Sequence, residues 1–284
     1  TARSLRSRRT LTIAGIIPDI TNPFYPAFQR GVQDAAEAAG YDLVTFNTDG
    51  DAAKERKALR SAREARVDGI LITPFHLGLA DLRPPIEDGI AVVVNGDVPY
   101  DPTPLGIDVV TVDNAAAAAA AVDYLIDRGH VRIGMIAGAA GTPPRESRVR
   151  GYVAALREHA LPLDPVLIRH GDFAETGGYQ AAGELLKLRD RPTAIFAAND
   201  LMAMGAMMRF REDGLLVPDD IAIVAFDDIP AARLVHPALT TVAQFPERIG
   251  KRTAELAVDR LGGGAPATGR RAVLPFELIV RESA

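Results

Sequence analysis

The stretch that decides the fold is residues 12–46, TIAGIIPDITNPFYPAFQRGVQDAAEAAGYDLVTF. Its two ends, Thr12–Ile17 and Asp42–Phe46, are short and rich in β-branched residues, which is typical of strands. Between them, Pro23–Ala39 carries apolar residues at helical spacing and closes at Gly40, a residue type that readily takes the left-handed conformation found at helix ends. A strand, a helix and another strand in this order predict two parallel strands joined by a helix.

The same alternation continues along the rest of the chain and runs twice, with a joint near residues 112–114. Apolar strands of this kind favour parallel sheets that helices cover on both faces. The sequence therefore predicts an α/β protein with two doubly wound parallel-sheet lobes. In addition, Ala115–Ala121 predicts a helix that a neighbour can approach closely. Further strands are expected at Gly69–Thr73, Ala91–Val94, Val109–Val112, Ile133–Ala137, Val166–Arg169, Thr193–Ala197, Ile221–Phe226 and Ala272–Val280.

The composition argues against several kinds of chemistry. The 284 residues include no cysteine, which excludes disulfides, thiolate metal sites and cysteine nucleophiles. The five histidines lack metal-ligand spacing, and the turn after Ile17 lacks the glycines of a dinucleotide-binding or phosphate-binding loop. No stretch approaches the ~18 apolar residues that span a bilayer. We therefore expect no enzymatic activity, no cofactor, no metal and no membrane partner.

Charge is distributed unevenly, with a basic lead in front of an acidic body. Residues 1–9 hold four arginines and no acidic residue, although the whole chain has 37 Asp and Glu against 32 Lys and Arg. This asymmetry indicates a partner that carries phosphates and meets the amino-terminal end only.

Short polar side chains and aromatic rings follow nearly every expected strand. Ligands of open parallel sheets bind beyond the carboxyl ends of the strands, so these residues are the candidates for a binding site. Carboxylates accept hydrogen bonds from hydroxyl groups, arginine donates two parallel bonds, and rings cover apolar faces, which suits a polyhydroxylated or heterocyclic small molecule. The candidates are Asp19, Phe24, Tyr25, Asn47, Asp49, Thr73, Asn95 and Asp97 in the first half, and Arg145, Arg148, Asp172, Phe173, Asn199, Asp200, Asp227 and Asp228 in the second.

Simpler roles stay open for several of these residues. Asn199 and Asp200 precede an expected helix, and capping of its first turn would account for both. Asp227 and Asp228 would equally suit a short capped turn, and Arg148 would suit a solvated position near the start of a helix.

Eight motifs, in order along residues 10–283, resemble the effector-binding core of the lactose-repressor (LacI) family of bacterial transcriptional regulators. The resemblance implies the type I periplasmic-binding-protein architecture, in which two lobes are joined by three crossover strands. It places a residual hinge or linker at 1–10, the amino-terminal lobe at 11–112 plus 243–270, and the carboxyl-terminal lobe at 113–242 plus 271–284. The motifs are Thr12–Tyr25, Arg66–Ile70, Arg128–Gly134, Arg148–Tyr152, Gly171–Phe173, Ala198–Ala203, Phe226–Pro230 and Leu239–Val242.

By resemblance, a small-molecule effector binds between the lobes and allosterically controls operator binding. A carbohydrate is the expected effector. However, Asn95 stands where sugar-responsive relatives often carry Asp, and Phe173 replaces the Trp of some sugar binders, so a purine-like or other small polar effector stays open. The expected contacts are Phe24, Tyr25, Asn95, Arg148, Phe173, Asn199, Asp227 and Gln244.

The basic lead, Ala2–Thr10, resembles the end of the regulators' hinge helix and the linker that follows it. The helix-turn-helix headpiece has no counterpart in the sequence, so we expect a shortened or processed chain that reaches operator DNA only through that absent headpiece. The resemblance also implies a homodimer or tetramer in the cytoplasm. The alternative is an exported, periplasmic-type solute-binding protein of the same fold, which a signal peptide encoded upstream would reveal.

Overall fold

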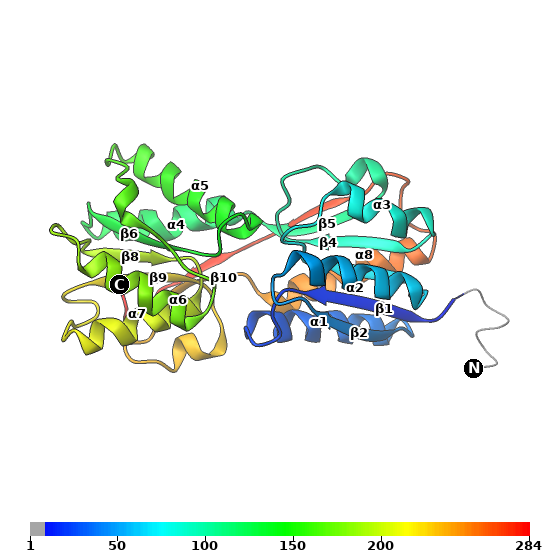
Figure 1. Ribbon diagram of the computed structural model, residues 1–284, viewed down its shortest axis with the longest axis horizontal. Helices are drawn as coiled ribbons and strands as arrows, with labels where there is room; N and C mark the ends of the chain where they lie inside the picture. The colour runs from blue at the N-terminus through cyan, green and yellow to red at the C-terminus, as the bar shows by residue number, and fades with distance from the viewer. Residues whose placement is uncertain (1–8) are drawn as a thin grey trace. The chain divides into compact units, whose positions relative to one another are not determined.

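Residues 9–284, the part of the chain that the computed structural model describes, form two units, and the backbone passes from one to the other three times (Figure 1). Each unit has its own sheet and its own helices. Unit 1 consists of the residues up to Thr111 together with Pro246–Leu274, and unit 2 of Val112–Phe245 together with Pro275–Ala284.

A six-stranded sheet with strand order β11-β5-β4-β3-β1-β2 forms the centre of unit 1. The pairs among β1 to β5 are all parallel. The strands are β1 (Thr12–Ile17), β2 (Asp42–Asn47), β3 (Gly69–Ile72), β4 (Ala91–Asn95), β5 (Asp108–Val112) and β11 (Arg271–Leu274). The helices are α1 (Phe24–Ala38), α2 (Ala52–Glu64), α3 (Leu79–Glu87) and α8 (Pro246–Leu261), with a short 3-10 turn at Thr103–Leu105.

A second six-stranded sheet, with order β12-β10-β9-β8-β6-β7, forms the centre of unit 2. Its pairs are parallel, except that β12 runs antiparallel to β10. The strands are β6 (Ile133–Ala137), β7 (Ile168–His170), β8 (Ala194–Ala197), β9 (Ala222–Asp227), β10 (Thr240–Ala243) and β12 (Glu277–Ile279). The helices are α4 (Asn114–Asp127), α5 (Pro143–Glu158), α6 (Glu175–Leu186) and α7 (Asp200–Glu212), with 3-10 turns at Pro165–Leu167 and Pro230–Arg233. The prediction of two doubly wound parallel-sheet lobes is thereby confirmed.

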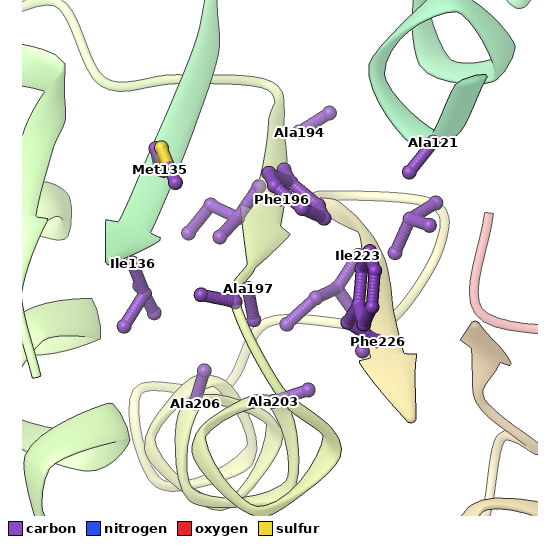
Figure 2. Close-up of a cluster of buried hydrophobic side chains, with 14 of the residues drawn as sticks. Ala121, Met135, Ile136, Ala194, Phe196, Ala197, Ala203, Ala206, Ile223 and Phe226 are labelled. Carbon is purple, nitrogen blue, oxygen red and sulfur yellow. The ribbon is translucent and has the colours of Figure 1, made fainter. Parts of the chain in front are cut away.

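Each unit buries its own apolar core between sheet and helices. Figure 2 shows the core of unit 2, where Phe196 of β8 and Phe226 of β9 lie among side chains that include Ala121 of α4 and Ala203 of α7. The small helical residues allow the helices to lie close to the sheet, so the two rings fill the space between the layers.

Helix pairs approach each other through glycine and alanine. In unit 1, a Cβ added to Gly31 of α1 would lie 2.0 Å from the Glu247 carbonyl oxygen of α8. In unit 2, a Cβ added to Gly151 of α5 would lie 2.2 Å from the Ala115 carbonyl oxygen and 2.8 Å from the Ala118 side chain of α4. The expectation that the alanine-rich helix admits a close neighbour is therefore confirmed.

The end of the chain differs from the single strand expected at Ala272–Val280. It forms two strands, β11 in the sheet of unit 1 and β12 in the sheet of unit 2. Pro275 lies between them, and a proline has no N–H to continue a ladder of hydrogen bonds. The expected single strand is therefore wrong, and the chain crosses between the units at this point.

The structure also draws the unit boundaries at different residues from those expected. Because β11 lies beside β5, unit 1 extends to Leu274 rather than to 270, and Gln244 lies in unit 2 rather than in the first lobe. The expected hinge at 1–10 falls mostly on residues 1–8, which lie outside the described residues. Thr10 and Leu11 donate their backbone N–H groups to Asp68, at 3.2 and 2.6 Å, which fixes the entry to β1.

Candidate functional site

The carboxyl ends of the strands in unit 2 carry a group of buried polar side chains. Asp227 is the last residue of β9, Asn199 follows β8 and caps α7, and Gln244 follows β10. Arg148 reaches the same edge from the second turn of α5. All four are at most 5% exposed, so each needs partners that replace its lost hydration.

Arg148 is held in place by contacts around its whole guanidinium group. Its Nε donates to Asn114 Oδ1 at 3.0 Å, and its Nη1 donates to the carbonyl oxygen of Ala198. The guanidinium carbon lies 3.8 Å from the centre of the Phe226 ring, which is within the range of a cation–π contact. The solvated position considered for Arg148 is therefore wrong, because the side chain is built into the unit.

Asp227 accepts a hydrogen bond from Gln244 Nε2 at 2.7 Å and lies 3.7 Å from Arg148 Nη2. Burial raises the pKa of the Asp227 carboxyl to about 6, and the nearby charge of Arg148 and the bond from Gln244 limit the rise. At neutral pH this carboxyl is therefore largely ionised, so that it can accept hydrogen bonds but not donate them.

Asn199 and Phe173 form a second pair in unit 2. The Asn199 side chain accepts from Met202 N at 3.0 Å, which makes it the N-cap of α7, and donates from Nδ2 to the Phe173 carbonyl oxygen at 2.9 Å. The capping role considered for Asn199 is thus confirmed. The bond holds Phe173 at a positive φ of 69°, and the ring lies against Gly138 just after β6, where any Cβ would meet it at 1.9 Å.

In unit 1, Phe24 and Tyr25 open α1 just beyond the end of β1. Their ring centres are 5.3 Å apart at an interplanar angle of 81°, and both residues are half-buried. Asn95, the last residue of β4, is 4% exposed and donates from Nδ2 to Thr73 Oγ1 at 2.9 Å. Each of these residues therefore lies at the carboxyl edge of the unit 1 sheet, as the strand pattern predicts.

One residue of the unit 2 group, Asn114, is not among the candidates that the sequence predicts, and Asp200 makes contacts that the sequence does not predict. Asn114 orients Arg148, yet in sequence it is merely the polar start of an alanine-rich helix, and Asp113 before it is the actual cap. Asp200 is expected from the sequence either at the binding site or as a helix cap, whereas its carboxyl accepts hydrogen bonds from Ile229 N and Thr241 Oγ1, far along the chain. No local spacing in the sequence signals the contacts of Asn114 and Asp200, because these contacts join segments that are distant along the chain.

The unit 2 group offers one carboxylate acceptor, one oriented guanidinium, two amides and a ring that lies over a glycine. Such a set recognises hydroxyl groups or ring nitrogens of a small polar molecule. Among residues 9–284 no three His, Asp or Glu side chains come together as a metal site would require. The arrangement is suited to binding.

Comparisons with known proteins agree with this architecture. The family model for the periplasmic binding protein-like domain matches residues 122–284. The HTH-type transcriptional repressor CytR of Escherichia coli (strain K12) is 34% identical over 287 residues, covering 99% of this chain and 81% of that protein. A LacI family transcriptional regulator from Enterococcus faecium, with bound ribose, has a TM-score of 0.85 at 27% identity, covering 96% of this chain and 98% of that one. The chain belongs to the LacI family of transcriptional regulators.

Another solved relative is the transcriptional regulator CelR in complex with cellobiose. It has a TM-score of 0.89 at 30% identity over 100% of this chain and 89% of that chain. These relatives confirm the LacI-family resemblance and the periplasmic-binding-protein-like fold, and they favour a regulator over the exported solute-binding alternative. They are regulators rather than enzymes. Within residues 9–284, no helix combines the length and the apolar character that a membrane crossing requires.

Proposed function

We propose that this LacI-family core senses a carbohydrate, and that Arg148, Asp227 and Gln244 of unit 2 are the principal effector contacts. The observation that carries the proposal is the buried Arg148–Asp227–Gln244 group. Burying an arginine and an aspartate 3.7 Å apart costs desolvation that a purely structural pair seldom recovers. A ligand that donates further hydrogen bonds to the Asp227 carboxylate supplies a reason for the arrangement. The other proposed contacts are Phe24, Tyr25, Asn95, Phe173 and Asn199.

Carbohydrate chemistry matches the geometry of these side chains. Sugar hydroxyls donate to an ionised carboxylate and accept from a guanidinium group, and charge-assisted bonds of this kind are about twice as strong as neutral ones. The Phe173 ring, fixed over Gly138, offers an apolar face. Two of the structural relatives contain cellobiose and ribose, respectively, which supports a sugar as the effector of this chain.

The same proposal assigns the chain its partners and place in the cell. Effector occupancy controls operator binding through a helix-turn-helix segment of the kind named in the relatives, and the core associates as a homodimer or tetramer in the cytoplasm. The bound sugar leaves chemically unchanged, as expected for a relative of transcriptional regulators and repressors.

Thermal unfolding with a ligand panel tests the proposal. Ribose, cellobiose and adenosine are each titrated into the chain, and calorimetry measures the affinity of any that stabilise it. A sugar present at 100 times its dissociation constant adds about 2.7 kcal/mol to the free energy of unfolding. Asp227→Asn keeps the shape of the side chain but replaces the charged acceptor, so the affinity is expected to fall by about 10- to 100-fold.

Asp219→Asn is the matched control, because Asp219 is an exposed aspartate of the same unit. It is expected to bind like the wild type. Equal affinities for the wild type and the Asp227→Asn variant would refute the assigned site. Stabilisation by adenosine together with none by either sugar would refute the carbohydrate class while leaving the sensing role intact.

A further inference from the structure

A strained bend follows strand β9 in unit 2. Asp227 and Asp228 both have positive φ angles, of 116° and 55°. Residues with a side chain rarely take such angles, and two in succession persist only where the surroundings hold them. The bend determines where the Asp227 carboxylate points, so the groups that hold it also shape the proposed effector site.

The Asp200 side chain bonds the backbone directly after this bend. It is fully buried at the first turn of α7, and its Oδ2 accepts from the backbone N–H of Ile229 at 2.8 Å. Its Oδ1 lies 2.6 Å from the Thr241 hydroxyl on β10. One carboxyl group therefore links three parts of the unit: helix α7, the segment that follows β9, and strand β10. A second tie comes from Arg281, which donates to Asp228 Oδ1 at 2.6 Å.

The charge state of Asp200 follows from what faces it. Burial and the neighbouring charges of Asp227 and Asp228 raise the pKa of the Asp200 carboxyl well above its usual range. The bonds from Thr241 and Ile229 oppose this rise, and so does the start of α7, which favours an anion.

The charge of Asp227 disfavours ionisation of Asp200, so the surroundings of the two carboxyl groups decide which of them ionises more readily. Asp227 has Arg148 and Gln244 beside it, whereas Arg281 pairs with Asp228 rather than with Asp200. Of two adjacent buried carboxyls, the one with a cationic partner ionises first.

We propose that Asp200 is a positioning residue that, as a neutral carboxylic acid, bonds Ile229 and Thr241 and so fixes the bend that aims Asp227 at Arg148 and Gln244. The proposal deepens the proposed function, since it concerns the shape of the same site. A neutral acid at this position lets Asp227 carry the only charge of the carboxyl pair, in which case Asn is an adequate replacement for Asp200. In the structure the Thr241 hydroxyl donates to Asp200 Oδ1. An asparagine would accept from Ile229 N through its Oδ1 and donate from Nδ2 to Thr241 Oγ1, since a hydroxyl group can also accept.

The test follows the Asp227 carboxyl carbon by NMR in chain labelled with ¹³C-aspartate, as the pH is varied and without any effector. In the wild type, the titration midpoint is expected at about 6. Asp200→Asn is expected to leave it unchanged, because one neutral group replaces another. Asp200→Ala removes both bonds, so the bend relaxes, water reaches Asp227 and its midpoint falls toward the ordinary value of about 3.9. Asp219→Asn serves as the control for the exposed carboxyls.

Each outcome decides a part of the proposal. A midpoint that falls in Asp200→Asn as far as in Asp200→Ala would show that Asp200 is charged in the wild type and would overturn the neutral acid. A midpoint unchanged in both variants would show that other groups hold the bend. Should Asp200→Ala fail to fold, Thr241→Val removes one of the two bonds alone and is expected to lower the titration midpoint of Asp227 part of the way. An unchanged midpoint in Thr241→Val would equally overturn the positioning role. No effector is present, so the result does not depend on the carbohydrate assignment.

Discussion

Replacement of Asp227 by asparagine is expected to make the chain more stable at neutral pH. Burial raises the pKa of this carboxyl from 3.8 to about 6 in the folded chain. The folded state therefore holds the proton more tightly than the unfolded chain does. The stabilisation that protonation supplies is complete below about pH 4 and is lost as the pH rises through about 6.

The magnitude follows from the size of the pKa difference. A rise of about two units corresponds to about 3 kcal/mol at 1.36 kcal/mol per unit. Asparagine resembles the protonated acid and does not titrate. The variant and the wild type are therefore expected to be equally stable at pH 4, and the variant is expected to be more stable by about 3 kcal/mol at pH 7.

Urea unfolding followed by far-ultraviolet circular dichroism at pH 4 and pH 7 measures this difference. Other carboxyls change stability with pH in both proteins alike, so only the difference between the two proteins is interpreted. Asp219→Asn is expected to follow the wild type at both pH values. A stability difference between the two proteins that is the same at pH 4 and pH 7 would refute the reasoning, because ionisation of Asp227 would then not destabilise the folded state. A variant that is more stable yet binds sugar more weakly would show that the wild type retains this charge for binding.

Two further predictions concern packing and buried charge in unit 1. Gly250→Ala would place a Cβ 1.9 Å from the Phe28 carbonyl oxygen, so α8 must move away from α1, and the free energy of unfolding is expected to fall by about 3 kcal/mol. Gly78→Ala is the control, because a Cβ there meets open space and should change the stability little. Equal midpoints in urea for the two variants would contradict the prediction. Asp108→Asn leaves Arg260 and Arg270 with a neutral partner at a fully buried position, and the free energy of unfolding is expected to fall by about 3 kcal/mol in the same assay. A loss of stability below about 1 kcal/mol would show that water solvates the two arginines in place of the carboxylate.

The alternation of strands and helices was predictable because each element carries its own period and its own end signals. Gly40 after the first helix is one such signal, and its φ of 82° is the left-handed conformation expected there. The final crossing was not predictable in this way. The residues on either side of Pro275 both suit a strand, and only pairing with β5 and β10 decides that they belong to different sheets.

The candidate site was predictable to the extent that strand ends are recognisable. Asp227 and Asn199 follow strands, so their position at the edge of a sheet comes from the pattern alone. The environment of each side chain could not be predicted from that pattern. Arg148 is buried because Asn114 and the Ala198 carbonyl lie beside it, and those contacts depend on how α4 and β8 pack. The roles of these residues in effector binding stay predictions.

The three crossings have a consequence for synthesis on the ribosome. Unit 1 takes α8 and β11 from residues 246–274, and unit 2 takes β12 from the last ten residues of the chain. Neither sheet can therefore gain its full set of strands until β11 and β12 have emerged, long after the first strands of each sheet. At about 5–20 residues per second, the apolar surface of α1 that α8 covers stays exposed for more than about ten seconds after α1 is made. During that interval the nascent chain offers a chaperone an apolar surface that the finished protein conceals.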